Sequence, residues 1–134
     1  MDSEIRLAIA KLARRMRQER GASDLGPSQF GVLMSLKIGG PQTLGELSAQ
    51  ERVTAPSMNR TVNLLEASGL LSRTASPDDG RKVIIELTDA GRAVLDDTRR
   101  RRDAWFGERV ATLSDEEKTA LEAATPVLRK LAEL

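Results

Sequence analysis

The sequence predicts a mainly α-helical fold with one small β-hairpin, which follows a closely spaced pair of short helices. Apolar residues recur at helical spacing through most of the chain, and helix-capping residues divide this pattern into segments. Between residues 70 and 87 the pattern becomes strand-like on both sides of the turn sequence Ser-Pro-Asp-Asp-Gly. Two helices joined by a three-residue turn at 51–53 and followed by a hairpin form a winged helix-turn-helix.

An apolar stripe and helix-breaking residues predict the first two helices. The first helix is expected over about residues 3–20, with a stripe at helical spacing formed by Ile5, Ile9, Leu12 and Met16. Gly21 begins the break that follows this helix. Ser28 is the predicted cap of a second helix, which the sequence Gly-Gly-Pro at 39–41 ends.

Capping signals place the next two helices. Thr43 and Glu46 have the spacing of a capping box, in which each side chain satisfies the backbone N–H of the other residue. Thr54 is a second N-cap, and Pro56 is tolerated in the first turn because its missing N–H would be unpaired there. Gly69 suits the left-handed conformation that often ends a helix. The predicted ranges are 44–50 and 54–68.

The remaining elements are a two-stranded hairpin and two helices. Either Thr88 or Asp89 is expected to cap a long helix, and Ser114 and Glu117 form a capping box before the last helix. We expect Pro126 to kink the last helix or to divide it in two. The predicted ranges are 70–75 and 81–87 for the strands and about 89–112 and 115–134 for the helices.

Apolar stripes at the two ends of the chain predict a homodimer. A chain this small has little core of its own left to cover them, although the two stripes burying each other in one monomer is the alternative. The stripe residues are Ile5, Ile9, Leu12 and Met16 in the first helix and Leu121, Leu128, Leu131 and Leu134 in the last. The predicted organisation is an N-terminal dimerisation helix at 1–27, a winged helix-turn-helix DNA-binding region at 28–91, and a long linking helix with the C-terminal dimerisation helix at 92–134.

Composition argues against several classes of protein. The 134 residues include no Cys and no His, so we expect no disulfide and no zinc, copper or iron site of ordinary type. Without a histidine base or a glycine-rich phosphate loop, we expect neither an enzyme nor a cofactor. No apolar run approaches the roughly 20 residues that span a membrane, and the N-terminus lacks the order of a secretory signal. A cytoplasmic protein without a membrane partner is therefore expected.

The polar face of the fourth helix carries side chains of the types that contact DNA bases. Asparagine pairs with adenine, arginine with guanine and serine with either, and the short residues at its start allow close approach to the major-groove floor. The candidate contacts here are Thr54, Ala55, Pro56, Ser57, Asn59, Arg60 and Asn63. We expect the apolar face to pack against Leu44 and Leu47, through Met58, Val62 and Leu65 with Leu64 nearby. An ordinary solvated helix face is the alternative to DNA contact.

Basic residues in the hairpin are the second group of candidate DNA contacts. Arg81 and Lys82 lie at the turn, where a basic side chain can enter the minor groove, and Arg73 lies in the first strand. The acidic residues Asp78 and Asp79 share the loop. They would repel phosphate unless they pair with Arg81 or with the backbone of the turn itself.

The charge balance leaves a second hypothesis open. Residues 44–88 contain five basic and six acidic side chains, so we expect weak non-specific DNA binding and an affinity that depends on placement and dimerisation. A winged-helix module for protein–protein contact, without DNA affinity, is the alternative. The arginines at 14–17 and 99–102 are interpreted as solvated helix faces, and the scarcity of aromatic residues favours duplex over single-stranded nucleic acid.

Two stretches of the sequence occur together in one known family. They are TLGELSAQERVTAPSMNRTVNLLEASGLLSR at 43–73 and DDGRKVIIELTDAG at 78–91, the second carrying Asp79, Arg81, Leu87, Thr88 and Gly91. They resemble the helix-turn-helix and the wing signature of the MarR family of transcriptional regulators, and the helical flanks match in length and order. The resemblance implies a homodimer with interleaved terminal helices. It also implies recognition helices, here 54–63, in successive major grooves about 10 bp apart, and Arg81 in the minor groove.

The resemblance implies further properties and shows some departures. Many family members are released from DNA when a small, often aromatic, anionic compound binds between the dimerisation and DNA-binding parts, so a repressor with a small-molecule effector is expected. Gly80 stands where relatives often have a basic residue, which removes one phosphate contact. The lack of Cys excludes the thiol-oxidation switch of the family, and the lack of His disfavours its metal-responsive mode.

Overall fold

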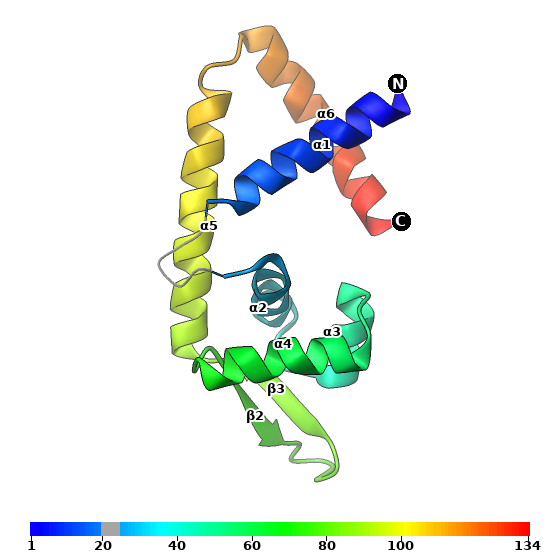
Figure 1. The fold of residues 1–134 in the computed structure, drawn as a ribbon, viewed down its shortest axis with the longest axis vertical. Helices are drawn as coiled ribbons and strands as arrows, with labels where there is room; N and C mark the ends of the chain where they lie inside the picture. Colours follow the sequence, from blue (N-terminus) through cyan, green and yellow to red (C-terminus); the bar gives the residue numbers. More distant parts are fainter. Residues whose placement is uncertain (20–24) are drawn as a thin grey trace. The chain divides into compact units, whose positions relative to one another are not determined.

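The computed structural model describes residues 1–19 and 25–134, which form helices and a small sheet (Figure 1). The elements are α1 Asp2–Arg17, α2 Pro27–Gly39, β1 Gln42–Thr43, α3 Leu44–Glu51, α4 Ala55–Ala67, β2 Leu71–Ala75, β3 Val83–Leu87, α5 Asp89–Val110 and α6 Asp115–Glu133. The predicted fold class, mainly helical with a β-hairpin wing, is confirmed. The chain divides into two compact units, residues 1–102 and 103–134. The predicted division into 1–27, 28–91 and 92–134 concerns function and stays a prediction.

Capping residues determine where the helices of the first unit begin. Thr43 and Thr54 each accept a hydrogen bond from a first-turn backbone N–H, at 3.2 and 3.3 Å, as predicted. The reciprocal half of the predicted Thr43–Glu46 capping box is wrong, because Glu46 Oε1 accepts from the Thr43 hydroxyl at 3.1 Å instead of from its backbone N–H. The predicted Ser28 cap is wrong, because α2 already begins at Pro27 with Gly26 as its N-cap. Proline suits the first position of a helix, since its φ is already helical and its missing N–H would have no partner there.

The sheet has three antiparallel strands in the order β1-β3-β2, so the predicted two-stranded hairpin gains a strand. In β1, Gln42 and Thr43 pair with Ile85 and Ile84 of the central strand β3. Two residues are too few to show the alternation by which strands are found in a sequence. The extra strand directly precedes α3 and joins the start of the helix pair to the hairpin.

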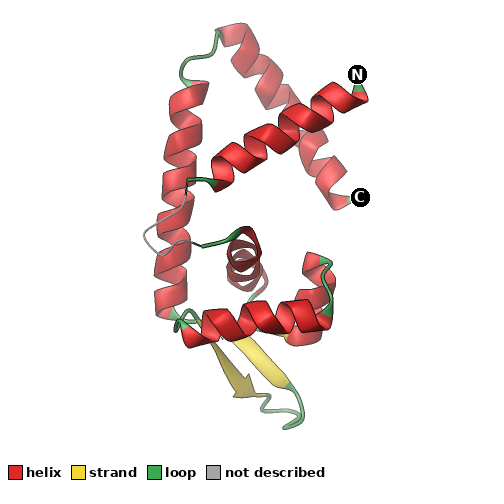
Figure 2. Ribbon diagram, viewed as in Figure 1, coloured by secondary structure: helices red, strands yellow, loops and turns green. Residues whose placement is uncertain are grey.

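One hydrophobic core supports the helix pair and the sheet. Its buried members are Leu25, Val32, Leu33, Leu36, Leu47, Met58, Val62, Leu65, Leu70, Leu71, Ile85 and Leu95. The predicted inward face of α4 is confirmed for Met58, Val62 and Leu65, whereas Leu64 is 59% exposed and does not join it. One residue corresponds to about 100° of helix rotation, which turns Leu64 away from the core when Leu65 faces inward. The β2–β3 hairpin extends past α4 into solvent (Figure 2).

The terminal helices differ from expectation in two details. The helix α6 continues through Pro126 as one element, so its predicted division is wrong; hydrogen bonds on both sides of a proline can hold a helix together. The helix α1 ends at Arg17, and the predicted break at Gly21 lies outside the described residues. Of the helices in the described ranges, none has the length and apolar character needed to cross a membrane.

Candidate DNA-binding surface

The helix α4 exposes a polar face because its other face is anchored in the core. Pro56 stands in its first turn, and the Thr54 hydroxyl accepts a hydrogen bond from the Ser57 backbone N–H at 3.3 Å. The exposed candidates on this helix are Thr54, Ala55, Pro56, Asn59, Arg60 and Asn63, while Ser57 is half-buried. Within the described residues, the side chains of Arg60 and Asn63 have no hydrogen bond or ion pair. The predicted contacts on α4 therefore lie together on one accessible face.

Arg73 connects the wing to this face. Its guanidinium group donates to Asn59 Oδ1 at 3.0 Å and to Glu66 Oε1 at 2.8 Å, and its side chain is 24% exposed. Arg73 and Asn59 also line a hollow of about 380 Å³ together with Lys82. The first strand of the wing is thus tied to the face of α4 that carries the candidate DNA contacts, a link that the sequence analysis did not foresee.

The loop of the wing, the β2–β3 hairpin at residues 71–87, has an internally bonded turn. The Asp79 side chain accepts a hydrogen bond from the Arg81 backbone N–H at 3.0 Å, and Ser76 Oγ accepts one from the Asp78 N–H at 3.3 Å. The Asp79 carboxylate therefore points at its own turn, one of the two arrangements expected to limit its repulsion of phosphate. Arg81 and Lys82 are exposed, and across the described ranges their side chains have no partner.

The wing is attached to α5 through Thr88 and Gly91. The Thr88 hydroxyl donates to the Gly69 carbonyl at 2.7 Å and accepts from the Gly91 N–H at 3.0 Å, so it links the end of α4 to the start of α5. A Cβ atom on Gly91 would lie 1.9 Å from the carbonyl oxygen of Leu70. This close backbone approach explains why a Thr and a Gly three residues apart follow the wing, which the sequence alone did not explain.

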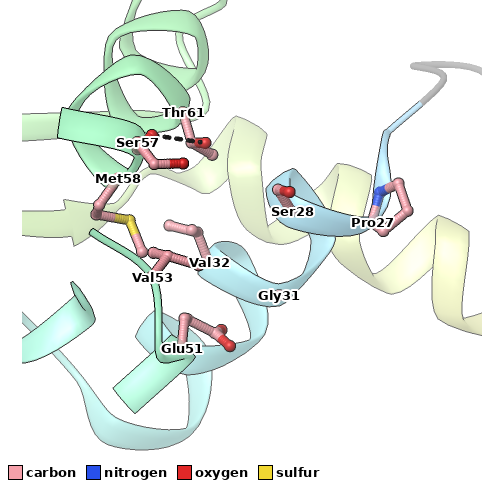
Figure 3. Close-up of a pocket in the computed structure, with 9 residues that line it drawn as sticks. All are labelled: Pro27, Ser28, Gly31, Val32, Glu51, Val53, Ser57, Met58 and Thr61. Carbon is pink, nitrogen blue, oxygen red and sulfur yellow. Dashed lines mark hydrogen bonds between the residues drawn. The ribbon is translucent and has the colours of Figure 1, made fainter. Parts of the chain in front are cut away.

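A hollow of about 250 Å³ lies between α2 and the start of α4 (Figure 3). Its lining residues are Pro27, Ser28, Gly31, Val32, Glu51, Val53, Ser57, Met58 and Thr61. Glu51 is the charged residue in this lining, and its Oε1 accepts a hydrogen bond from the Ser35 hydroxyl at 2.8 Å. The hollow borders the helix that carries the candidate DNA contacts, since Ser57, Met58 and Thr61 belong to α4.

Several charged side chains outside the candidate DNA contacts form ion pairs with one another. Lys37 on α2 pairs with Asp96 on α5 at 2.5 Å, and this hydrogen bond is the main cause that lowers the pKa of Asp96. Arg100 and Arg101 pair with Asp97, as expected of a solvated face. Arg102 instead lies over the Phe30 ring, with 4.0 Å between its guanidinium carbon and the ring centre. In the part of the chain that is described, no group of Asp and Glu residues is arranged to hold a metal ion.

The residues predicted to form a dimer are largely exposed in the single chain. On α1, Ile5, Ile9 and Leu12 are exposed and Met16 is half-buried. On α6 the exposed apolar residues include Leu128, Leu131 and Leu134, whereas Leu121 is half-buried. Each helix therefore presents an apolar stripe at helical spacing to solvent.

Comparisons with known proteins agree with this arrangement. A sequence profile of the MarR family matches residues 23–82. An HTH-type transcriptional regulator of Mycobacterium bovis is 34% identical over 131 residues, which are 98% of this chain and 92% of that protein. The HTH-type transcriptional regulator MhqR of Bacillus subtilis is 32% identical over 107 residues, covering 80% of this chain and 72% of the relative. The crystal structure of a transcriptional regulator protein from Pseudomonas aeruginosa is similar, with 31% identity, a TM-score of 0.83 and coverage of 99% and 94%. The chain therefore belongs to the MarR family of helix-turn-helix transcriptional regulators and is a DNA-binding transcriptional regulator.

Proposed function

We propose that this regulator is a homodimeric, cytoplasmic repressor that binds a pseudo-palindromic duplex operator, with α4 in the major groove and the wing at the minor groove. The observation that carries the proposal is the exposed polar face of α4 beside a projecting wing with two exposed basic residues. Direct contacts are assigned to Thr54, Ala55, Pro56, Ser57, Asn59, Arg60, Asn63, Arg81 and Lys82. Arg73 acts at the same surface.

Placement of charge, rather than its total, accounts for DNA affinity in this proposal. Residues 44–88 carry a net charge of about −1, yet Asp79 is bonded to its own turn and Glu66 to Arg73. The N-terminus of α4 adds partial positive charge at its first turn, next to Thr54, where it can attract phosphate. Specific binding then depends on a few well-placed contacts, and the non-specific component is weak.

Dimerisation through α1 and α6 provides the two-fold symmetry of the operator. The exposed stripes on both helices would lose contact with water in such an interface, and residues 1–27 and 92–134 are assigned to it. Two α4 helices related by this symmetry would contact half-sites whose centres lie about 10 bp apart.

A small-molecule effector is the last part of the proposal. The hollow beside α4 is a candidate site, because a ligand there would touch Ser57, Met58 and Thr61 and could displace the recognition helix. Glu51 in its lining favours a neutral or cationic aromatic compound over the anionic compound that the family resemblance implies. Release of bound operator by a neutral aromatic compound, weakened in Thr61→Trp, would support this site.

Selection from a pool of random duplexes tests the proposal as a whole. The purified protein should enrich an inverted repeat with half-site centres about 10 bp apart, and its affinity should fall steeply with salt because phosphate contacts release counterions. Arg81→Ala should lower the affinity and Asn59→Ala should relax the preference at one base pair. Arg92→Ala is the control, because Arg92 is an exposed arginine of α5 outside both candidate contact groups.

The outcome separates the two classes of function. Enrichment of an inverted repeat supports the dimeric repressor and supplies an operator for locating target genes. If the parent and both variants enrich no motif even at low salt, the repressor proposal fails for the free protein, and the protein–protein module that the charge balance of residues 44–88 allows becomes the function to test.

A further inference from the structure

We propose that Arg73 and Glu66 are positioning residues for base recognition, which orient the side chain of Asn59 without contacting a base themselves. The proposal rests on the proposed function, since it concerns the base that Asn59 contacts. It assigns to Arg73 a different role from that of a direct DNA contact. Glu66, which carries a negative charge, belongs to no predicted DNA-binding group.

The geometry places all three groups in one chain of hydrogen bonds. Asn59 and Glu66 lie on α4, seven residues apart and so on the same side of the helix. Arg73 reaches them from β2, with Nη2 donating to Asn59 Oδ1 at 3.0 Å and Nη1 donating to Glu66 Oε1 at 2.8 Å. The half-buried guanidinium group of Arg73 is thus fixed by its ion pair with Glu66, and it in turn fixes the side-chain oxygen of Asn59 through a hydrogen bond.

The chemistry of the guanidinium group decides which end of the amide faces it. Arginine has five N–H donors and no acceptor, so only the carbonyl oxygen of Asn59 can be bonded to Arg73. The amide nitrogen then points elsewhere, and among the described residues it donates to no partner. Asn59 is exposed, so this nitrogen is left to donate to a base.

The orientation has a consequence for base preference. Both adenine and guanine present the N7 acceptor in the major groove, whereas cytosine presents an amino donor there. Thymine also presents an acceptor there, O4, so an amide that offers its N–H donors suits adenine, guanine or thymine on the contacted strand and disfavours cytosine. Without Arg73 the amide could rotate and present either end, so its discrimination between bases would fall while its contact area stayed the same.

A positioning role of Glu66 is tested by measuring two quantities separately: the overall affinity for DNA and the discrimination between base pairs at one position. Dissociation constants are measured for operator duplexes, obtained by the selection above, that carry each of the four base pairs at the position sensitive to Asn59→Ala. Glu66→Ala should raise affinity for unrelated duplex, because a negative charge near DNA is removed, but reduce discrimination at this one position by about tenfold. Glu66→Gln keeps an oxygen that can accept from Arg73 and should retain discrimination.

Two further variants complete the test. Glu86→Ala removes a different exposed carboxylate, on the wing, so it should raise non-specific affinity with no change in discrimination at any position. Asn59→Asp keeps an acceptor for Arg73 but has no donor to offer, and should turn the discrimination against cytosine into a preference for cytosine.

The results distinguish this inference from the proposed function. Loss of discrimination confined to the Asn59 position in Glu66→Ala, with retention in Glu66→Gln, supports the positioning role. Unchanged discrimination at the Asn59 position in Glu66→Ala, or unchanged discrimination against cytosine in Asn59→Asp, overturns it while leaving DNA binding intact. Failure of the parent protein to prefer any duplex would overturn both proposals.

Discussion

At the scale of single residues, the junction between the wing and α5 depends on the absence of one side chain. Gly91 lies in the first turn of α5, directly against the carbonyl group of Leu70. Thr88 bonds to Gly69 on one side and to Gly91 on the other. The direction in which the wing leaves α5 is therefore set by backbone contacts that no larger residue at position 91 would permit.

Gly91→Ala is expected to lower the free energy of unfolding by about 3 kcal/mol, because its Cβ would overlap a backbone atom that cannot rotate away. Gly107→Ala is the matched control in the same helix. A Cβ there meets nothing within 4 Å, so the higher helix propensity of alanine should stabilise the protein by up to about 1 kcal/mol. Urea unfolding followed by circular dichroism measures both. Equal effects of the two variants on the free energy of unfolding would show that the close contact with Leu70 does not affect stability.

The Lys37–Asp96 ion pair is expected to make the stability of the folded protein depend on pH. The hydrogen bond from Lys37 lowers the pKa of the Asp96 carboxyl. Because the pKa is lower in the folded state, the pair contributes stability above the ordinary aspartate pKa, and this contribution disappears as the pH falls through the lowered value. Lys37→Met should raise the Asp96 pKa toward its ordinary value in an NMR titration of the carboxyl carbon. Lys11→Met, which removes an exposed lysine of α1, should leave it unchanged.

At the scale of secondary-structure elements, the short helix α4 has two roles, since one side packs in the core and the other side exposes polar residues. Its apolar side fills the core through three fully buried residues, and in the proposed function its first turn must stay formed to present short polar side chains to DNA. The N-cap satisfies a backbone donor that the helix itself leaves unpaired. The same device begins α6, where Ser114 accepts from the Glu117 N–H at 3.1 Å.

Thr54→Ala should destabilise the protein by about 1 kcal/mol through loss of the α4 cap, and should also weaken operator binding because the first turn frays and the proposed Thr54 contact is lost. Ser114→Ala removes the equivalent cap of α6 and should cost a similar free energy of unfolding without a matching loss of DNA affinity. Thr54→Ser keeps the cap and should restore both properties. Thermal unfolding and a fluorescence-anisotropy titration with operator duplex measure the two effects. Equal DNA affinities for Thr54→Ala and Ser114→Ala would contradict the link between cap and recognition.

At the scale of the whole molecule, α1 and α6 carry the exposed apolar stripes on which the proposed homodimer depends. Ile5, Ile9 and Leu12 on α1 and Leu128, Leu131 and Leu134 on α6 are each at least 40% exposed. Leaving such continuous stripes in water is unfavourable, and covering them in a dimer would stabilise both helices. The proposed dimer would also join two modest DNA-binding surfaces, which would raise operator affinity without any new contact.

The double variant Leu128→Glu with Leu131→Glu is expected to be monomeric, because each subunit would have to bury a carboxylate in the apolar interface. Sedimentation velocity over a range of protein concentrations measures the change in mass, and operator affinity should fall in parallel. Lys130→Glu is the control, since about 200° of helix rotation separates Lys130 from Leu128 and turns it away from the stripe. A double variant that still sediments as the parent does would contradict dimerisation through α6.

Local chemistry in the sequence was sufficient to predict most of the elements. Capping residues, proline and glycine act on backbone within a few positions, so Thr43, Thr54 and Gly69 were identified as helix boundaries without any tertiary information. Helical periodicity likewise identified the buried face of α4, and the alternating pattern identified both long strands of the wing. The family was recognisable for the same reason, since its signature lies in contiguous stretches.

Contacts between distant parts of the chain were decided only by the tertiary structure. The strand β1, the Gly91–Leu70 contact and the Lys37–Asp96 pair, whose members are 59 residues apart, leave no periodic or capping signal in the sequence. The same is true of Arg73, which the sequence identified as a candidate DNA contact and the structure bonds to Asn59 and Glu66. Such partners meet because burial of a shared core brings β2 and α4 together, and this packing depends on all the elements at once.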